Sequence, residues 1–236
     1  MVIGYLLVID YWSLVIFMRS ILLIDKPSGI TSFDVIRKLR RQLGIRKMGH
    51  AGTLDPLASG LLIICTGKFT KRINEYMAQE KEYTGSFTLG ATTPTYDLES
   101  KPENFKTVDD ITEEKIKAAA KQFTGAILQV PPAHSAIKVG GKRVYELARQ
   151  GKEVKLEPRP VTIHEFEITE IKMPVVYFRV VCSTGTYIRS LAHDAGAALG
   201  CGAYLSNLCR TRIGNFSVTD AMTIDAFEEK IKKLIG

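Results

Sequence analysis

GHAGTLDPLASG, residues 49–60, runs directly into the apolar segment LLIIC, residues 61–65. Three glycines and one proline predict a constrained loop, and the five apolar residues after it predict a buried strand. Because proline biases the preceding residue toward extended backbone, Asp55 is presented from a rigid loop. Such a loop can aim a carboxylate at a substrate. Asp is also a common turn residue, so a carboxylate that only shapes the turn is the alternative.

A basic segment lies immediately before this loop. It places six cations within residues 37–47, namely Arg37, Lys38, Arg40, Arg41, Arg46 and Lys47. A carboxylate beside such a patch indicates a polyanionic substrate. The whole chain agrees, since 32 Lys and Arg against 25 Asp and Glu give a net charge of +7, which favours nucleic acid or an anionic surface as partner. Taken alone, the cations fit a solvated helix face as well as phosphate contacts.

Cysteine and histidine usage argues against metal or disulfide chemistry. Cys65, Cys182, Cys201 and Cys209 form no C-x-x-C pair, and the four histidines are scattered along the chain. We therefore expect no metal site, no disulfide framework and a cytoplasmic location. The length of 236 residues suits one large domain with an insertion.

The first 18 residues form an apolar run that Asp10 interrupts, with no basic residue ahead of it. The run lacks the charged start of a signal peptide, and it is short and charged for a membrane-spanning helix. We interpret it as an extra amphipathic segment or a start codon assigned too early. A membrane anchor is the remaining alternative.

Periodicity and capping signals predict the remaining elements. Strands are expected at 21–24, 81–89, 161–173 and 175–183, and helices at 31–44, 68–77, 112–123, 188–199 and 223–235. Alternation along 81–89 places Tyr83 on an inward face, where most tyrosines are core residues. Arg189 falls in the first turn of a helix, where the helix dipole disfavours a cation. We therefore expect an acidic partner for Arg189, and Asp55 is the candidate.

Residues 129–159 are predicted to leave the sheet as an insertion. They contain paired prolines, Gly140-Gly141 and Gly151, and seven basic residues against three acidic ones. The turn-forming prolines and glycines and the net positive charge predict a flap that covers phosphates.

Several of these motifs resemble those of the bacterial TruB-type tRNA pseudouridine synthases, which isomerise the uridine at position 55 in the T loop. The segments that carry the resemblance are GHAGTLDPLASGLL, KEY at 81–83, PPAHSAIKVGGKRVYELAR and QGKEV in the insertion, GTYIR at 185–189 and AYLSNLCRT at 203–211. The resemblance covers residues 19–220 and implies an α+β fold, with a largely antiparallel mixed sheet flanked by helices and a thumb-like insertion at 129–159. Bacterial members usually continue into a PUA domain, and we expect none in residues 19–236, which form the catalytic domain.

The resemblance also implies roles for individual residues. Asp55 is the catalytic aspartate, Tyr83 stacks on the target uracil, and Arg189 pairs with Asp55. The residues implied to contact substrate are His50, Tyr187, Leu208, Asp97 and Lys26. For Asp97, contact with RNA and contact with local backbone remain equally open.

The reaction breaks the N1–C1′ bond, turns the uracil and joins C5 to C1′, so no cofactor is implied. A carboxylate at the ribose can attack C1′, or stabilise positive charge there and take the C2′ proton, and the sequence does not choose between these routes. The expected partner is the T stem-loop of tRNA, without an obligate protein partner, and the chain is expected to be a monomer. An RNA-guided dyskerin-type synthase and a non-catalytic tRNA-folding chaperone are the alternatives.

Overall fold

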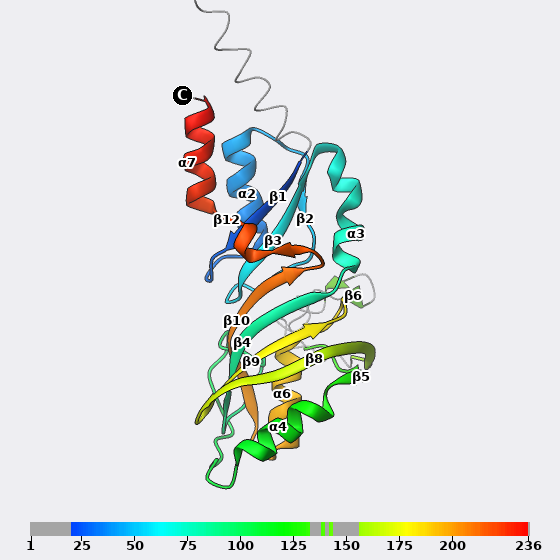
Figure 1. The fold of residues 1–236 in the computed structure, drawn as a ribbon, viewed down its shortest axis with the longest axis vertical. Coiled ribbons are helices and arrows are strands. Elements are labelled where there is room, and N and C mark those ends of the chain that lie inside the picture. The colour runs from blue at the N-terminus through cyan, green and yellow to red at the C-terminus, as the bar shows by residue number, and fades with distance from the viewer. Residues whose placement is uncertain (1–19, 133–137, 140–141, 144–155, 236) are drawn as a thin grey trace, which may run out of the picture. The chain divides into compact units, whose positions relative to one another are not determined.

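The computed structural model describes residues 20–132, 138–139, 142–143 and 156–235 (Figure 1). The chain divides into two compact units: unit 1 runs up to Lys81 and resumes at Cys209, and unit 2 runs from Glu82 to Leu208. The predicted extension 1–18 lies outside the described residues, as does most of the insertion predicted at 129–159.

Unit 1 is built around the strand β3, which follows the loop of Asp55. Its strands are β1 (Ile21–Lys26), β2 (Met48–His50), β3 (Ser59–Thr66), the end of β10 (Ala203–Ile213), β11 (Phe216–Ser217) and β12 (Met222–Thr223). β1 and β2 both pair with β3 in antiparallel register, whereas β10 pairs with it in parallel at Ser59 and Gly60. The predicted strand at 61–65 is thereby confirmed as the central strand of this unit.

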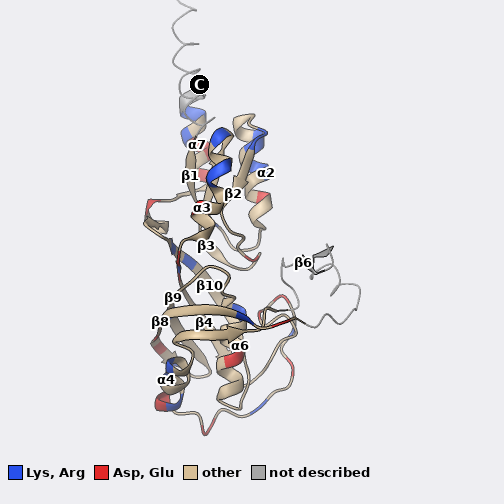
Figure 2. Ribbon diagram, turned by 90° about the vertical axis from the view of Figure 1, so that its right-hand side faces the viewer, with Lys and Arg blue, Asp and Glu red and all other residues tan. Residues whose placement is uncertain are grey.

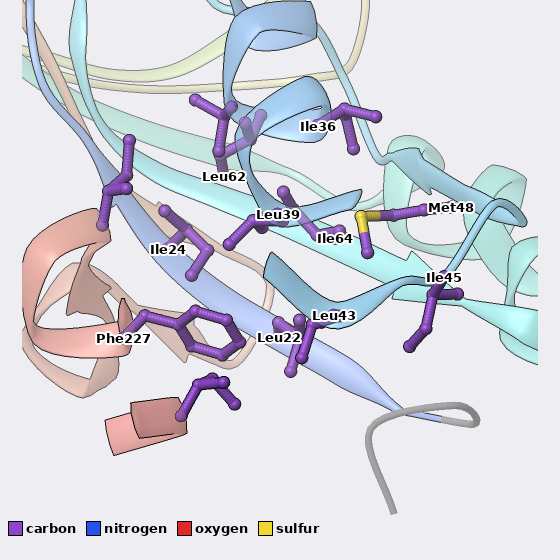
Figure 3. Packing of buried hydrophobic residues seen from close by; sticks show 13 residues of the cluster. Leu22, Ile24, Ile36, Leu39, Leu43, Ile45, Met48, Leu62, Ile64 and Phe227 are labelled. Atoms are coloured by element: carbon purple, nitrogen blue, oxygen red, sulfur yellow. The ribbon is translucent and has the colours of Figure 1, made fainter. Parts of the chain in front are cut away.

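β3 is buried on both faces, which explains its uninterrupted apolar sequence. Leu62 and Ile64 pack into one cluster with residues of two helices, which Figure 3 shows around Leu39 and Phe227. Leu61, Ile63 and Cys65 point into a second cluster, which contains Tyr76 and Ile213.

The helices of unit 1 follow their local signals. They are α2 (Ser32–Leu43), the 3₁₀ helix η1 (Gly67–Arg72), α3 (Ile73–Ala78), the 3₁₀ helix η2 (Val218–Asp220) and α7 (Ile224–Ile235). Thr31 caps α2 in a capping box with Asp34, and Gly44 ends the helix with a φ of 66°. The segment predicted as one helix at 68–77 is instead a 3₁₀ turn followed by a short α-helix.

Unit 2 contains the start of β10 and the strands β4 (Lys81–Leu89), β9 (Val175–Cys182), β8 (Arg159–Lys172) and β5 (Gly125–Gln129), which neighbour one another in that order. The short strands β6 (Lys138–Val139) and β7 (Lys142–Arg143) pair with each other. The helices of the unit are α4 (Glu113–Gln122) and α6 (Ile188–Ala198). Strands β4, β8 and β9 were predicted correctly, whereas β5 and β10 were not assigned from the sequence.

The core of unit 2 includes aromatic side chains from three neighbouring strands. Phe87 of β4 stacks on Phe178 of β9 with ring centroids 5.9 Å apart, and Phe166 of β8 meets Phe178 edge to face at 6.0 Å. Such pairs add to the stabilisation that burial alone supplies. This packing holds β4, the strand that carries Tyr83.

The strands are mostly antiparallel, with parallel pairs at β1–β12 and β3–β10, and helices accompany the sheet in each unit. The predicted α+β class with a mixed, largely antiparallel sheet is confirmed. Across residues 20–235, apart from the undescribed segments, no helix combines the length and apolarity that a membrane crossing needs. Over the same range, no three His, Cys, Asp or Glu side chains are grouped so as to hold a metal ion.

Asp194 on α6 should make stability depend on pH. Burial raises the pKa of this carboxyl from 3.8 to about 6. The folded state therefore holds the proton more tightly than the unfolded state, and stability falls as pH rises from about 4 to about 6. We expect Asp194→Asn to be more stable than the wild type above pH 6, by at most about 3 kcal/mol, with the difference vanishing near pH 4.

Urea unfolding of both proteins between pH 4 and pH 8 measures this difference. The exposed Asp109→Asn is the matched control and should follow the wild type throughout. An Asp194→Asn protein that is no more stable than the wild type at the upper end of this range would contradict the assignment.

Candidate active site

The loop that carries Asp55 connects β2 to β3 in unit 1. Asp55 itself is partly exposed, and its carbonyl oxygen accepts a hydrogen bond of 3.1 Å from the Ala58 amide. Gly60 closes the loop with a φ of +100°, and a Cβ there would lie 2.4 Å from the Arg210 carbonyl oxygen. Only glycine fits this position, so the loop enters β3 at a fixed angle.

The first residue of α2 and the segment before this helix hold one side of the loop. Ser32 Oγ accepts from the Leu54 amide at 2.9 Å and donates to the Leu54 carbonyl at 3.1 Å. The Gly29 amide donates to the Pro56 carbonyl at 2.8 Å, and Ser28 Oγ donates to the Leu57 carbonyl at 2.7 Å. The residues on both sides of Asp55 are therefore fixed by hydrogen bonds to their backbone.

Lys26 lies fully buried beneath the same loop. Its Nζ donates to the carbonyl oxygens of Pro27 at 2.9 Å, Ile30 at 2.7 Å and Pro56 at 3.2 Å. Burial lowers the pKa of Lys26 to about 8, while the charge of Asp55 acts in the opposite direction. Three carbonyl oxygens match the three protons of the ammonium group, so these contacts describe a residue that organises the loop.

Arg210 holds the other side of the loop from strand β10. Its side chain is 1% exposed, with Nε donating to Leu61 O at 2.8 Å, Nη1 to Thr53 O at 3.4 Å and Nη2 to Gly52 O at 3.2 Å. The sequence analysis did not single out this residue. One signal could have identified it: Arg210 lies two residues after Leu208, so the two side chains share the inward face of a strand. An arginine on that face needs several hydrogen-bond acceptors.

His50 ends β2 and leads into the loop. Burial lowers the pKa of the imidazole, and the nearby charge of Arg210 lowers it further, while a hydrogen bond with the Gly52 backbone acts in the opposite direction. His50 is therefore neutral near pH 7. A neutral, partly buried ring beside the loop suits contact with an uncharged base.

Tyr83 and Leu208 lie on the neighbouring strands β4 and β10 of unit 2. Their exposed fractions are 8% and 7%, so the inward position predicted for Tyr83 is confirmed. The two strands are held together by Ser86 Oγ and Ser206 Oγ, which lie 2.9 Å apart.

The start of α6 is anchored to the end of β5. The Gln129 side chain accepts from the Tyr187 amide at 2.8 Å and donates to the Tyr187 carbonyl at 3.0 Å. Ser190 Oγ donates to the Val130 carbonyl at 2.8 Å. Arg189 lies between these two anchors, so the first helical turn holds its backbone rigidly.

Arg189 is 4% exposed and has an acidic neighbour within unit 2. Its Nη1 lies 3.5 Å from Asp97 Oδ2 and donates to the Thr95 carbonyl at 3.3 Å. Asp97 Oδ1 accepts from the Glu99 amide at 3.0 Å, so Asp97 has the local backbone contact that the sequence left open. The expected need for an acidic partner is confirmed with Asp97. The pairing of Arg189 with Asp55, which belongs to unit 1, stays a prediction.

The predicted residues thus fall into two groups. Unit 1 brings together Asp55, His50 and Lys26, whose loop is bounded by Arg210. Unit 2 contains Tyr83, Asp97, Tyr187, Arg189 and Leu208. Lys and Arg positions also recur along α2 in unit 1, where the ribbon is coloured blue in Figure 2.

Replacing Arg210 by Met should loosen the loop of Asp55. The variant leaves three backbone carbonyl oxygens without their donor, and each unsatisfied group costs about 1–3 kcal/mol. We expect the free energy of unfolding to fall by about 3 kcal/mol or more, and amide exchange to quicken in residues 52–61. Denaturant unfolding and hydrogen exchange measure the two effects.

Arg212→Met is the matched control on the same strand. Arg212 is paired with Glu80 at a distance of 2.8 Å, and its side chain is 30% exposed. Arg212 Nη1 also donates to the Gly214 carbonyl at 2.9 Å, so the control should lose about 1–2 kcal/mol, less than the Arg210 variant. If both variants lost the same free energy of unfolding, the stabilisation of the loop by Arg210 would be contradicted.

Comparison with known proteins identifies the family. Residues 40–188 match the N-terminal domain of the TruB family of pseudouridylate synthases, and residues 189–234 match the C-terminal domain of tRNA pseudouridylate synthase B. The chain is 52% identical over 220 residues to the tRNA pseudouridine synthase B of Flavobacterium johnsoniae, a match that covers 90% of this chain and 96% of that protein. The enzyme of the same name from Chloroherpeton thalassium is 48% identical, with 90% of each chain covered.

Solved structures agree with the fold. A Cbf5–Nop10–Gar1 complex contains a chain of similar structure with a TM-score of 0.71 and 32% identity, and an archaeal box H/ACA Nop10–Cbf5 complex contains one with a TM-score of 0.69 and 29% identity. Each match covers 93% of this chain, which spans 59% and 58% of those chains. The loop of Asp55, the architecture and the family matches lead to one conclusion: the chain belongs to the TruB family of pseudouridylate synthases.

Proposed function

We propose that this chain converts the uridine at position 55 in the T loop of tRNA into pseudouridine, with Asp55 acting on the ribose. The observation that carries the proposal is the loop of Asp55, whose neighbouring residues are held from both sides by hydrogen bonds. Isomerisation needs a carboxylate at a fixed position, because the same carbon, C1′, loses a bond to N1 and gains one to C5.

Asp55 serves as the nucleophile at C1′, or as the group that stabilises charge there and removes the C2′ proton. Both routes need the ionised carboxylate. Two buried cations, Lys26 and Arg210, flank the backbone of its loop, and nearby positive charge favours ionisation of a carboxyl group. This mechanism uses one ionised carboxylate, whereas a glycosidase uses a pair of carboxyl groups.

Recognition of the base is assigned to Tyr83, Leu208 and His50. The target nucleotide must leave the RNA stack, which costs a few kcal/mol. Stacking of uracil on Tyr83 recovers about 1–3 kcal/mol of this cost, and Leu208 supplies an apolar contact. The neutral ring of His50 occupies the space that the base leaves. Tyr83 also assists removal of the C5 proton in the final step.

Arg189, Asp97 and Tyr187 complete the proposed site. Arg189 orients the catalytic carboxylate, and Asp97 keeps the guanidinium in place, as their distance of 3.5 Å supports. Tyr187 helps to hold the base from the rigid start of α6. Lys26 contributes through the loop that it holds, and its contact with substrate stays a prediction.

The chain is proposed to act without a guide RNA or protein partner. The relatives with 48–52% identity carry the name tRNA pseudouridine synthase B, whereas the Cbf5 chains, at 29–32% identity, occur in complexes with Nop10. Activity of the purified chain on an isolated T stem-loop separates these readings, since an RNA-guided enzyme would leave that substrate unmodified.

Asp55→Asn tests the central assignment. The amide keeps the size of the side chain but cannot act as a nucleophile or base, so we expect pseudouridine formation to fall by at least about 1000-fold. Binding of tRNA should stay within about threefold, because the phosphate contacts are unchanged. Tritium release from uridine-labelled tRNA and mapping of the modified position measure the activity, and filter binding measures the affinity.

The exposed Asp109→Asn serves as the matched control and should retain full activity. Turnover by Asp55→Asn would reject the catalytic role of Asp55. Activity at another tRNA position in the wild type would reject the proposed target while leaving the role of Asp55 intact.

The basic face of α2 is proposed to contact phosphates of the tRNA. Arg37, Lys38 and Arg41 are exposed, whereas Arg40 donates to the Met48 carbonyl at 2.8 Å and holds the fold. We expect the variant in which all three exposed residues are replaced by Gln to bind tRNA about tenfold or more weakly. The slope of log K against log salt concentration should become shallower by about 2–3, because three phosphate contacts are lost. The rate at saturating tRNA should not change.

Removing three exposed lysines from α4, namely Lys115, Lys117 and Lys121, provides a control with the same loss of charge. An equal weakening of tRNA binding by both triple variants would indicate a general charge effect and contradict a specific contact through α2.

A further inference from the structure

Tyr96 adopts a backbone conformation that a tyrosine rarely takes. Its φ is +63°, in the left-handed region that favours glycine and asparagine. Its amide donates to the Thr93 carbonyl at 3.1 Å, and its carbonyl accepts from the Leu205 amide at 2.9 Å. Strained backbone of this kind persists only where surrounding contacts hold it, and it often marks a functional site.

The ring of Tyr96 lies flat against His193. The two ring centroids are 3.8 Å apart and the planes are inclined by only 14°. His193 follows Arg189 by one helical turn on α6, so both side chains leave the same face of the helix. His193 Nδ1 is buried and has no hydrogen-bond partner within the described part of the chain, and burial lowers the pKa of the ring. His193 therefore contacts Tyr96 as a neutral ring.

The residues on either side of Tyr96 both contact Arg189. The Thr95 carbonyl accepts from Arg189 Nη1 at 3.3 Å, and Asp97 Oδ2 lies 3.5 Å from the same nitrogen. The backbone turn at Tyr96 thus decides whether a carbonyl and a carboxylate from residues 95 and 97 reach one guanidinium together. In an ordinary right-handed or extended conformation at Tyr96, these two groups would point in different directions.

We propose that Tyr96 and His193 are a positioning pair that holds Thr95 and Asp97 against Arg189, and so keeps the arginine in its catalytic orientation. The inference rests on the proposed function, in which Arg189 orients the catalytic carboxylate. Two side chains of α6 contact consecutive residues of one loop. Arg189 pairs with Asp97 by charge, and His193 stacks on Tyr96.

The test compares His193→Ala with His193→Phe in steady-state reactions on tRNA. Alanine removes the stack, and we expect kcat to fall about tenfold or more while KM and tRNA affinity stay within about twofold. Phenylalanine retains a flat ring and should restore most of the rate. His164→Ala, at an exposed position on β8, is the matched control and should behave as the wild type.

Tyr96→Gly separates the stack from the strained backbone. Glycine tolerates the positive φ but has no ring, so we expect the same loss of rate as in His193→Ala. The double variant should be no slower than either single variant, because both remove one interaction. Additive losses would overturn the pairing.

Exchange of the Arg189 guanidinium protons, followed by NMR, provides a readout that does not need activity. Exchange should be slow in the wild type and in His193→Phe, and faster in His193→Ala. The proposal is overturned if His193→Ala retains the wild-type rate, if its lost rate only follows lost thermal stability or tRNA binding, or if its exchange is unchanged. Failure of the proposed function would appear separately, as absence of pseudouridine in wild-type reactions with the exchange pattern intact.

Discussion

Two buried cations that donate to backbone carbonyl oxygens determine the conformation of the Asp55 loop. Lys26 reaches the loop from β1 and Arg210 from β10, and each donates to three carbonyl oxygens. Taking a cation out of water is costly unless such acceptors replace the water, so each cation and its acceptors stabilise one arrangement only. Burial lowers the pKa of Lys26, the charge of Asp55 raises it, and repulsion from Arg210 lowers it further. A negative charge at position 55 is therefore part of what makes the buried cations tolerable.

Unit 2 also contains a buried cation that contacts a loop through oxygen acceptors. The buried Arg189 has a carbonyl and a carboxylate from one loop as neighbours, and the amide of Gln129 fixes the start of its helix. A cation in the first turn opposes the helix dipole, and the nearby carboxylate of Asp97 offsets this unfavourable interaction. In both units a long basic side chain orders a loop that could adopt many conformations by itself. Under the proposed function, such arrangements hold Asp55 and Arg189 in place for the reaction of the TruB family, to which the chain belongs.

The elements with strong local signals were predictable. The helix from Thr31 to Gly44 has a capping box and a glycine C-cap, and β4 alternates along 81–89, so short-range interactions suffice to specify them. The strand β10 was not assigned, because its sequence AYLSNLCRTRI carries polar residues whose burial depends on the strands beside it. The role of Arg210 was missed for the same reason, since its acceptors lie about 150 residues earlier in the chain. The contact of Ser32 with Leu54 was missed likewise, because the two residues are 22 positions apart in the chain.

The sequence by itself indicated the class of chemistry and predicted a loop around which it would be organised. The order GHAGTLDPLASGLL specifies a rigid loop before a strand buried on both faces, and the basic balance of the chain indicates an anionic partner, because glycine, proline and charge act locally. Only the tertiary structure decided which groups hold that loop and which acid accompanies Arg189 within its unit. These choices depend on distances between residues far apart in the chain, such as Leu61 to Arg210 and Asp97 to Arg189, and packing alone sets those distances.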